Sequence, residues 1–304
     1  MLLITGATGF LGGHVVERLL RHPVTAYGPL RIFVRQRRRV PAHWPVDVVE
    51  GDLQDAGAVE RAVAGARAIL HLAGVSSAGT EAGYLRMNAE PARRLLEAAC
   101  RHGVERFVFA SSRLIDARAG GYARSKAAVE RLIADRLTDY VIVRLGELYG
   151  ANDRRGVMAL LAWMRRHRWV PVMGTDRCLM APLHVEDAAA AMVAALARGR
   201  AGQVYTITGP DLFTYGELVE AIEAALQGRR MQVRLPPRPL QWILRAAAPC
   251  CGDRLAYDQV DRLCAPRELM PPHVPQELGV SFRRFSEALP MLLREAATME
   301  APST

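Results

Sequence analysis

The chain of 304 residues is long enough for about two domains. Half of its residues are apolar, 23% are charged and the mean hydropathy is +0.03, values that exclude a disordered, collagen-like or low-complexity protein. The formal net charge of +9 favours an anionic ligand, such as a nucleotide or pyrophosphate, or a nucleic acid.

Short apolar runs alternate with helical patterns over the first 210 residues, which predicts an α/β fold with a doubly wound parallel sheet. The predicted strands span residues 2–5, 30–34, 46–49, 68–72, 106–110, 140–144 and 203–207. Helices are predicted from residue 11 and over 56–64, 91–100, 122–136 and 185–196, because apolar positions recur there at helical spacing.

The pattern changes beyond Gly209. Thr214 and Glu217 have the spacing of a capping box that opens a helix through residue 226. Proline clusters and short helices follow, which predict a smaller C-terminal lobe beside the sheet. We therefore assign a dinucleotide-binding domain to 1–150 and 184–209, and a substrate-binding lobe to 151–183 and 210–304.

Three glycines, Gly6, Gly9 and Gly12, separate the first strand from the first helix with G-x-x-G-x-x-G spacing. Glycines at this place allow a tight turn and a close approach to a pyrophosphate, whose charge then faces the helix N-terminus. Plain turns use glycines too, but the position directly after a strand favours a dinucleotide site on a Rossmann-type sheet.

The end of the second predicted strand distinguishes between two dinucleotides. An acidic residue there binds the ribose hydroxyls of NAD, whereas an arginine accommodates the additional phosphate of NADP. Residues 34–39 read Val-Arg-Gln-Arg-Arg-Arg and contain no acid. A solvated basic loop has the same composition, yet the glycine loop upstream leads us to predict NADP as the preferred cofactor, NAD as the alternative and Arg35 as a contact.

Tyr122 and Lys126 are one helical turn apart on the same face of a predicted helix. A tyrosine with a pKa near about 10 is a poor base at neutral pH, and a neighbouring cation lowers that pKa. Lys126 is the single lysine among 40 basic residues, and chemistry that needs a compact ammonium explains the exception. The alternative is a tyrosine and a lysine that share an amphipathic helix by chance.

An ordered series of motifs resembles the short-chain dehydrogenase/reductase superfamily, in its extended branch of NAD(P)-dependent epimerases, dehydratases and reductases. In chain order, the matching segments are 5–12, 51–53, 71–74, Asn88, 107–112, Tyr122 with Lys126, 144–150, 182–187 and 278–294. The resemblance implies a cofactor site formed by Gly6, Thr8, Gly9, Phe10, Leu11, Gly12, Arg35, Asp52, Leu53, Leu72, Ala73, Gly74, Tyr122 and Lys126. It implies catalytic roles for Asn88, Ser112, Tyr122 as acid/base and Lys126 as its tuner, with Ser111 as a possible substitute for Ser112 in substrate binding.

The implied reaction is hydride transfer between nicotinamide and a nucleoside-diphosphate sugar, by a 4-epimerase or a keto-sugar reductase. Related 4,6-dehydratases carry two acidic residues directly after the serine, where this chain has Arg113 and Leu114, so dehydration is disfavoured. Arg229 and Arg230 are candidates to bind the substrate pyrophosphate. The alternative is that they are exposed arginines that serve only solubility.

Two alternatives belong to other functional classes. Atypical members of the superfamily bind NADP(H) as structural or redox-sensing subunits, including an accessory subunit of respiratory complex I, and a related branch reduces small apolar ketones. The joint presence of Asn88, Ser112, Tyr122 and Lys126 argues against a pure binder.

The remaining expectations concern location and partners. Five cysteines without C-x-x-C spacing, no spanning segment and a first strand beginning at residue 2 predict a cytoplasmic protein without a signal peptide or membrane association. Scattered basic residues and 6% aromatics argue against nucleic acid, and no metal-ligand spacing is present. A homodimer is expected by analogy with the superfamily.

Overall fold

The computed structural model describes residues 1–151, 153, 156–173, 179–235, 239, 241, 242 and 258–298. Three of the five cysteines, Cys178, Cys250 and Cys251, lie outside these residues. Within the described ranges, no helix has the length and apolar character needed to cross a lipid bilayer.

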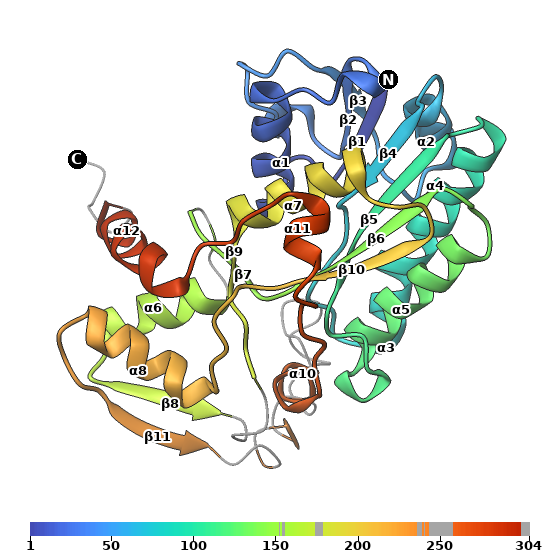
Figure 1. Ribbon diagram of the computed structural model, residues 1–304. Coiled ribbons are helices and arrows are strands. Elements are labelled where there is room, and N and C mark those ends of the chain that lie inside the picture. The colour runs from blue at the N-terminus through green and yellow to red at the C-terminus, as the bar shows by residue number, and fades with distance from the viewer. Residues whose placement is uncertain are drawn as a thin grey trace.

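A seven-stranded parallel sheet occupies the centre of the molecule in the order β10-β6-β5-β4-β1-β2-β3 (Figure 1). Its strands are β1 (Leu2–Thr5), β2 (Leu30–Val34), β3 (Asp47–Glu50), β4 (Ala68–His71), β5 (Arg106–Ser112), β6 (Tyr140–Leu145) and β10 (Gln203–Ile207). All seven predicted strands are confirmed, with small shifts at their ends. The winding direction reverses between β1 and β4, which opens a crevice for a ligand at the carboxyl ends of these strands.

Helices cover both faces of this sheet (Figure 1). One face carries α1 (Phe10–Arg21), α7 (Val185–Arg198) and α11 (Val274–Leu278), and the other carries α2 (Ala56–Val63), α4 (Glu90–Arg101) and α5 (Gly121–Ala134). Alternate residues of β1 reach the two apolar layers, since Leu2 and Ile4 pack with α1 and α7 while Leu3 packs with α2 and α4. Burial on both faces explains why the strands are almost uninterrupted apolar runs.

A second group of elements, here called the small lobe, has an apolar cluster of its own. It consists of α6 (Gly156–Arg166), β8 (Trp169–Met173), α8 (Tyr215–Ala225), β11 (Met231–Leu235) and α12 (Phe285–Thr298). Phe285 is 1% exposed at its centre, with its ring 5.2 Å from that of Tyr149 and 5.6 Å from that of Phe213. The predicted capping box of Thr214 and Glu217 is confirmed at the start of α8.

The C-terminal part of the chain does not belong to the small lobe alone. Val274 and Leu278 of α11 pack in the same cluster as α1 and α7. Further upstream, α10 (Gln259–Cys264) packs on the turn Ala117–Ala119, directly before α5. The domain bounds at residues 150, 183 and 209 stay a prediction.

The remaining short elements connect the large ones. They are α3 (Glu81–Tyr84), the π-helical turn Leu85–Ala89, the 3-10 turns Thr25–Tyr27 and Arg37–Arg39, and the paired strands β7 (Leu148–Tyr149) and β9 (Leu183–His184). Because α3 also packs on α5, three distant segments of the sequence meet near the start of that helix.

Candidate active site

The glycine loop connects β1 to α1 in a conformation that requires glycine. Gly6 has φ +76°, and a Cβ atom there would lie 2.6 Å from the backbone nitrogen of Ala73. Gly9 donates its N–H to the Gly6 carbonyl at 2.9 Å, and a Cβ on Gly12 would collide with the same carbonyl. The N-terminus of α1 has no side-chain cap at Gly9, so its backbone N–H groups face the loop and fit a pyrophosphate.

A groove of about 230 Å³ lies beside this loop, over the carboxyl ends of β1, β2 and β4. Most of the predicted cofactor residues line it: Gly6, Thr8, Gly9, Arg35, Asp52, Leu53, Leu72, Ala73 and Gly74. The lining also includes residues that were not among the predicted cofactor contacts: Phe33, Val34, Arg39, Gly51, Gln54, Val75, Met87 and Pro91. Five predicted cofactor residues lie outside the lining: Phe10, Leu11, Gly12, Tyr122 and Lys126. The Phe10 ring packs edge-on against His14.

Two exposed arginines mark one end of the groove. Arg35 directly follows β2, and Arg39 ends the 3-10 turn that comes next. Across from β2, the Asp52 carboxylate accepts the backbone N–H of Gln54 at 2.8 Å and fixes the turn that enters α2. The groove lining therefore includes two exposed arginines and an acidic turn.

Ser112 and Tyr122 meet at the carboxyl end of β5. Ser112 is the last residue of that strand, and Tyr122 lies in the first turn of α5. Burial raises the pKa of the Tyr122 phenol, and this effect is partly offset by the guanidinium of Arg262 and by a hydrogen bond with Ser112. The phenol is therefore protonated at neutral pH, and the neighbouring Ser112 hydroxyl can orient a substrate oxygen.

Lys126 extends from α5 towards Gly74, a residue that lines the groove. Its side chain is 6% exposed, its Nζ donates to the Ala110 carbonyl at 2.9 Å, and it lies 4.7 Å from the centre of the Phe109 ring. A Cβ atom on Gly74 would be 3.4 Å from this Nζ, which places the amine directly under the groove lining. Burial lowers the pKa of Lys126 to about 8. The cation found over the Tyr122 ring is Arg262, a residue that the sequence did not suggest.

Asn88 connects the groove to the helix of Tyr122. Its Oδ1 accepts the N–H of Val75 at 2.8 Å, and its Nδ2 donates to the Val75 carbonyl at 3.1 Å and to the Ser125 Oγ at 3.0 Å. The Ser125 hydroxyl in turn donates to the Tyr122 carbonyl at 2.8 Å. Through these hydrogen bonds, Asn88 fixes Val75 of the groove lining relative to the first turn of α5.

Three predicted substrate residues are not gathered at this place. Ser111 alternates with Ser112 along β5, and its buried hydroxyl donates to Glu130 at 2.5 Å. Arg229 is exposed at the end of the small lobe, and the Arg230 guanidinium donates to the carbonyls of Met164 and Gly228. Arg230 therefore fixes the turn before β11.

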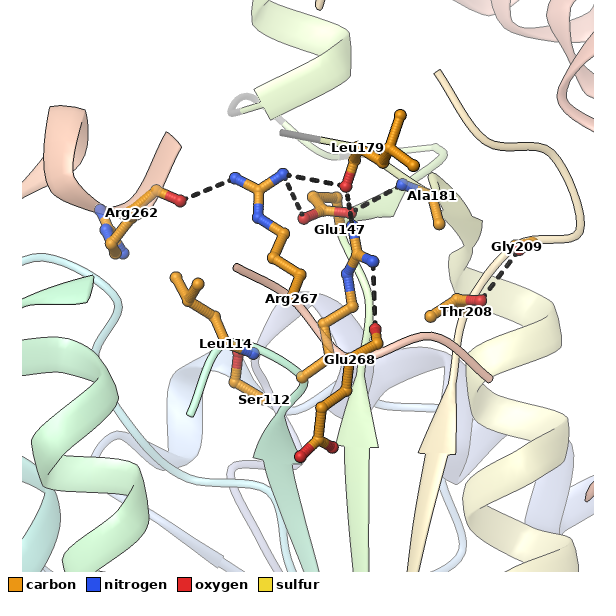
Figure 2. Close-up of polar contacts among 11 residues, drawn as sticks. Ser112, Leu114, Glu147, Leu179, Ala181, Thr208, Gly209, Arg262, Arg267 and Glu268 are labelled. Carbon is orange, nitrogen blue, oxygen red and sulfur yellow. Dashed lines mark hydrogen bonds and ion pairs between the residues drawn. The ribbon is translucent and has the colours of Figure 1, made fainter. Parts of the chain in front are cut away.

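A buried ion network stands next to Ser112 (Figure 2). Arg113, 1% exposed, donates to the Glu147 carboxylate at 2.7 Å, and Arg267 approaches the same carboxylate at 3.3 Å. Burial raises the pKa of Glu147, but the two guanidiniums outweigh it and hold the pKa below its usual range. The position that carries an acid in the related dehydratases is thus occupied by a guanidinium already paired inside the protein.

Comparisons with known proteins agree with this geometry. The family model described as "NAD dependent epimerase/dehydratase family" matches residues 2–208, more than half of the chain. A ceramide reductase of Caulobacter vibrioides is 33% identical over 243 residues, which cover 78% of this chain and 74% of that protein. The mitochondrial NADH dehydrogenase [ubiquinone] 1 alpha subcomplex subunit 9 of Arabidopsis thaliana is 27% identical over 251 residues, 77% of this chain but 60% of the subunit.

Among solved structures, a dTDP-glucose 4,6-dehydratase of Streptomyces venezuelae with bound NAD superimposes with a TM-score of 0.79. The alignment covers 98% of this chain and 97% of that chain at 23% identity, and it shows the shared fold. Together, the parallel sheet, the glycine loop and the family match show that this chain belongs to the NAD-dependent epimerase/dehydratase family, within the extended short-chain dehydrogenases/reductases.

Proposed function

We propose that the protein is an NADP(H)-dependent reductase of a carbonyl compound. A hydride adds to the carbonyl carbon, and the phenolic proton of Tyr122 passes to the carbonyl oxygen, which Ser112 orients. The observation that carries this proposal is the placement of the Ser112 hydroxyl, at the end of β5, beside Tyr122, whose burial raises its pKa and keeps the phenol protonated at neutral pH. Bound NADPH would supply the hydride from its nicotinamide.

The preference for NADP(H) rests on Arg35 and Arg39. Both residues line the groove and follow β2, where a ribose phosphate of the cofactor would lie, and their guanidiniums can offer charge-assisted hydrogen bonds to it. Loss of such a bond costs about 1.5 to 3 kcal/mol, or roughly 10- to 150-fold in affinity.

Calorimetric titration of single variants tests this preference. Arg35→Ala and Arg39→Ala are each expected to weaken NADP⁺ binding by about 10-fold or more and to leave NAD⁺ binding nearly unchanged. Arg38→Ala is the matched control, because Arg38 is exposed on the same turn but does not line the groove. Equal affinity of the parent protein for the two dinucleotides would overturn the preference.

For the substrate, a nucleoside-diphosphate keto sugar remains the proposal that follows from the sequence. Arg229 and Arg230 do not support it, since neither lies with Ser112 and Tyr122. A second substrate class, a ketone on a long apolar chain, is favoured by the 33% identity to a ceramide reductase. A non-catalytic role as an NADP(H)-binding subunit is the remaining candidate, and the match to a respiratory-chain subunit favours it.

Oxidation of NADPH measured with a panel of keto sugar nucleotides and long-chain ketones separates these candidates. Turnover with one class only, lost by about 100-fold or more in Tyr122→Phe but kept in Tyr140→Phe, is the expected result. Both variants should still bind NADPH, since the phenolic oxygen is needed for proton donation. Tight NADPH binding without turnover on any member of either class would overturn the reductase and favour the binding subunit.

A further inference from the structure

Helix α10 begins at a buried carboxylate that contacts the helix of Tyr122. Asp258, immediately before α10, is 0% exposed. Its Oδ2 accepts the backbone N–H of Tyr122 at 3.0 Å, and its Oδ1 accepts the hydroxyl of Tyr84 at 3.0 Å. Asp258 therefore acts as a hydrogen-bond acceptor for the first turn of α5, across 136 residues of sequence.

One turn further along α10, Arg262 lies against the face of the Tyr122 ring. Its guanidinium carbon is 5.1 Å from the ring centre, a distance typical of a cation–π contact. Its Nε is 3.5 Å from Asp258, and its Nη1 donates to the Ser76 carbonyl at 3.0 Å. With its side chain 17% exposed, Arg262 is fixed by a carboxylate, a carbonyl and the ring together.

The other end of α10 is attached to the network beside Ser112 (Figure 2). Arg267 donates to the Arg262 carbonyl at 2.8 Å and pairs with Glu147, the partner of Arg113. Contacts at both ends of α10 thus connect it to residues beside the proposed site. Asp258, before the helix, and Arg267, after it, therefore help to fix the position of Arg262 relative to the phenol.

We infer that Arg262 is a positioning residue for Tyr122, fixing the phenol ring and supplying the positive charge that stabilises the phenolate left after proton donation. The inference rests on the proposed function, in which the O–H bond of Tyr122 breaks and its proton passes to the substrate oxygen. In the opposite direction, the phenolate recovers a proton and neutrality returns. A guanidinium over the ring favours the charged form without itself giving up a proton, because its own pKa is far higher.

The groups that face Tyr122 come from three elements. They are Ser112 of β5, Tyr84 of α3, and Asp258 and Arg262 at α10. On the helix of Tyr122 itself, Lys126 donates a hydrogen bond from its Nζ to the Ala110 carbonyl. Burial and Asp258 raise the pKa of Tyr122, whereas Arg262 and Ser112 lower it. Removal of the Arg262 charge is therefore expected to raise that pKa, and replacement by another cation to preserve it.

The test places a fluorinated tyrosine at position 122 of the full chain and follows its ionisation by ¹⁹F NMR. Fluorination lowers the phenol pKa, so that ionisation is complete while the protein remains folded, and the label gives one assigned signal. In Arg262→Gln the pKa is expected to rise by about one unit, and in Arg262→Lys to stay within about half a unit of the parent. Arg118→Gln is the control, because this arginine is 76% exposed and pairs with Asp116 on the turn before α5.

An unchanged pKa in Arg262→Gln, or a Lys variant that titrates like the Gln variant, would overturn the inference. If Arg262→Gln does not fold, as judged by loss of NADP⁺ binding, Asp258→Asn/Arg262→Gln removes both charges and is expected to raise the pKa less than one unit. An unchanged pKa in Arg262→Lys with a raised pKa in the double variant supports the inference. Failure of the proposed function is seen separately, as turnover retained in Tyr122→Phe, and does not affect this titration.

Discussion

At the scale of single residues, Lys126 combines a proposed catalytic role with a cost in stability. Its amine is buried, and its pKa falls from an ordinary 10.5 to about 8. Below pH 8 the folded protein must hold an ammonium that water would solvate better. Between pH 8 and 10.5 the unfolded chain binds more protons at this group than the folded chain, so the free energy of unfolding rises with pH over that interval.

Replacement of this amine is expected to separate stability from activity. At pH 7, Lys126→Met should unfold at the same temperature as the parent or higher, while hydride transfer falls by about 100-fold or more. Thermal unfolding of the cofactor-free protein at pH 7 to 10 checks the first part, and the Met variant should lack the rise above pH 8. Arg131→Met, on the exposed side of α5, is the control. A parent-like pH slope in Lys126→Met would assign the rise to another group.

At the scale of elements, the contact between α5 and α10 depends on Gly120. This residue precedes α5 with φ +94°, and a Cβ atom there would meet the side chain of Asp258, 2.8 Å from its Oδ2. Any side chain at position 120 must displace the start of α10 or the first turn of α5. The absence of a side chain thus allows Asp258 to approach the Tyr122 backbone.

Gly120→Ala is expected to destabilise the protein more than a glycine replacement without this contact. Gly103 offers the comparison, since it has φ +62° and open space around its missing Cβ. Urea unfolding should show a loss of about 1 kcal/mol for Gly103→Ala, from backbone strain alone, and a clearly larger loss for Gly120→Ala. Equal losses in the two variants would show that α10 can move away from a side chain at position 120 without a loss in the free energy of unfolding.

The sequence predicted the elements whose signals are local. Alternating apolar residues and helical periodicity located the seven strands of the large sheet, and the capping box located the start of α8. The parallel pairing of β8 with β11 escaped prediction, because the two strands are far apart in sequence and each is short. The same reason applies to the site: Tyr122 and Lys126 follow from a four-residue spacing, whereas Arg262 reaches Tyr122 only through tertiary packing.

At the scale of the whole molecule, the centre of the sheet contains a histidine that resists protonation. His71 ends β4, is 2% exposed, stacks on Phe109 at 5.5 Å and shares a 2.6 Å hydrogen bond with Thr5 of β1. Burial lowers its pKa from 6.5 to about 3, and the charge of Lys126 adds to this effect. As pH falls below 6.5, the unfolded chain takes up a proton that the folded protein excludes, so the whole fold loses stability.

This loss can be measured against a variant without the imidazole. Urea unfolding at pH 6.5 and 4.5 should show that the parent loses about 2 kcal/mol more than His71→Gln over these two pH units. His273→Gln is the control, since this histidine is exposed. Identical losses in the parent and in His71→Gln would assign the acid sensitivity to other groups.

The burial of the single lysine has a consequence for proteolysis. A protease that cuts only after lysine has one peptide bond to attack in this chain, between Lys126 and Ala127 in the middle of α5. Because that bond lies in a packed helix, cleavage requires α5 to open, and the rate of cutting into residues 1–126 and 127–304 measures how often it does. The rate of cleavage after Lys126 thus reports the opening of α5, the helix that contains Tyr122. Ligands that stabilise the closed site should slow this cleavage.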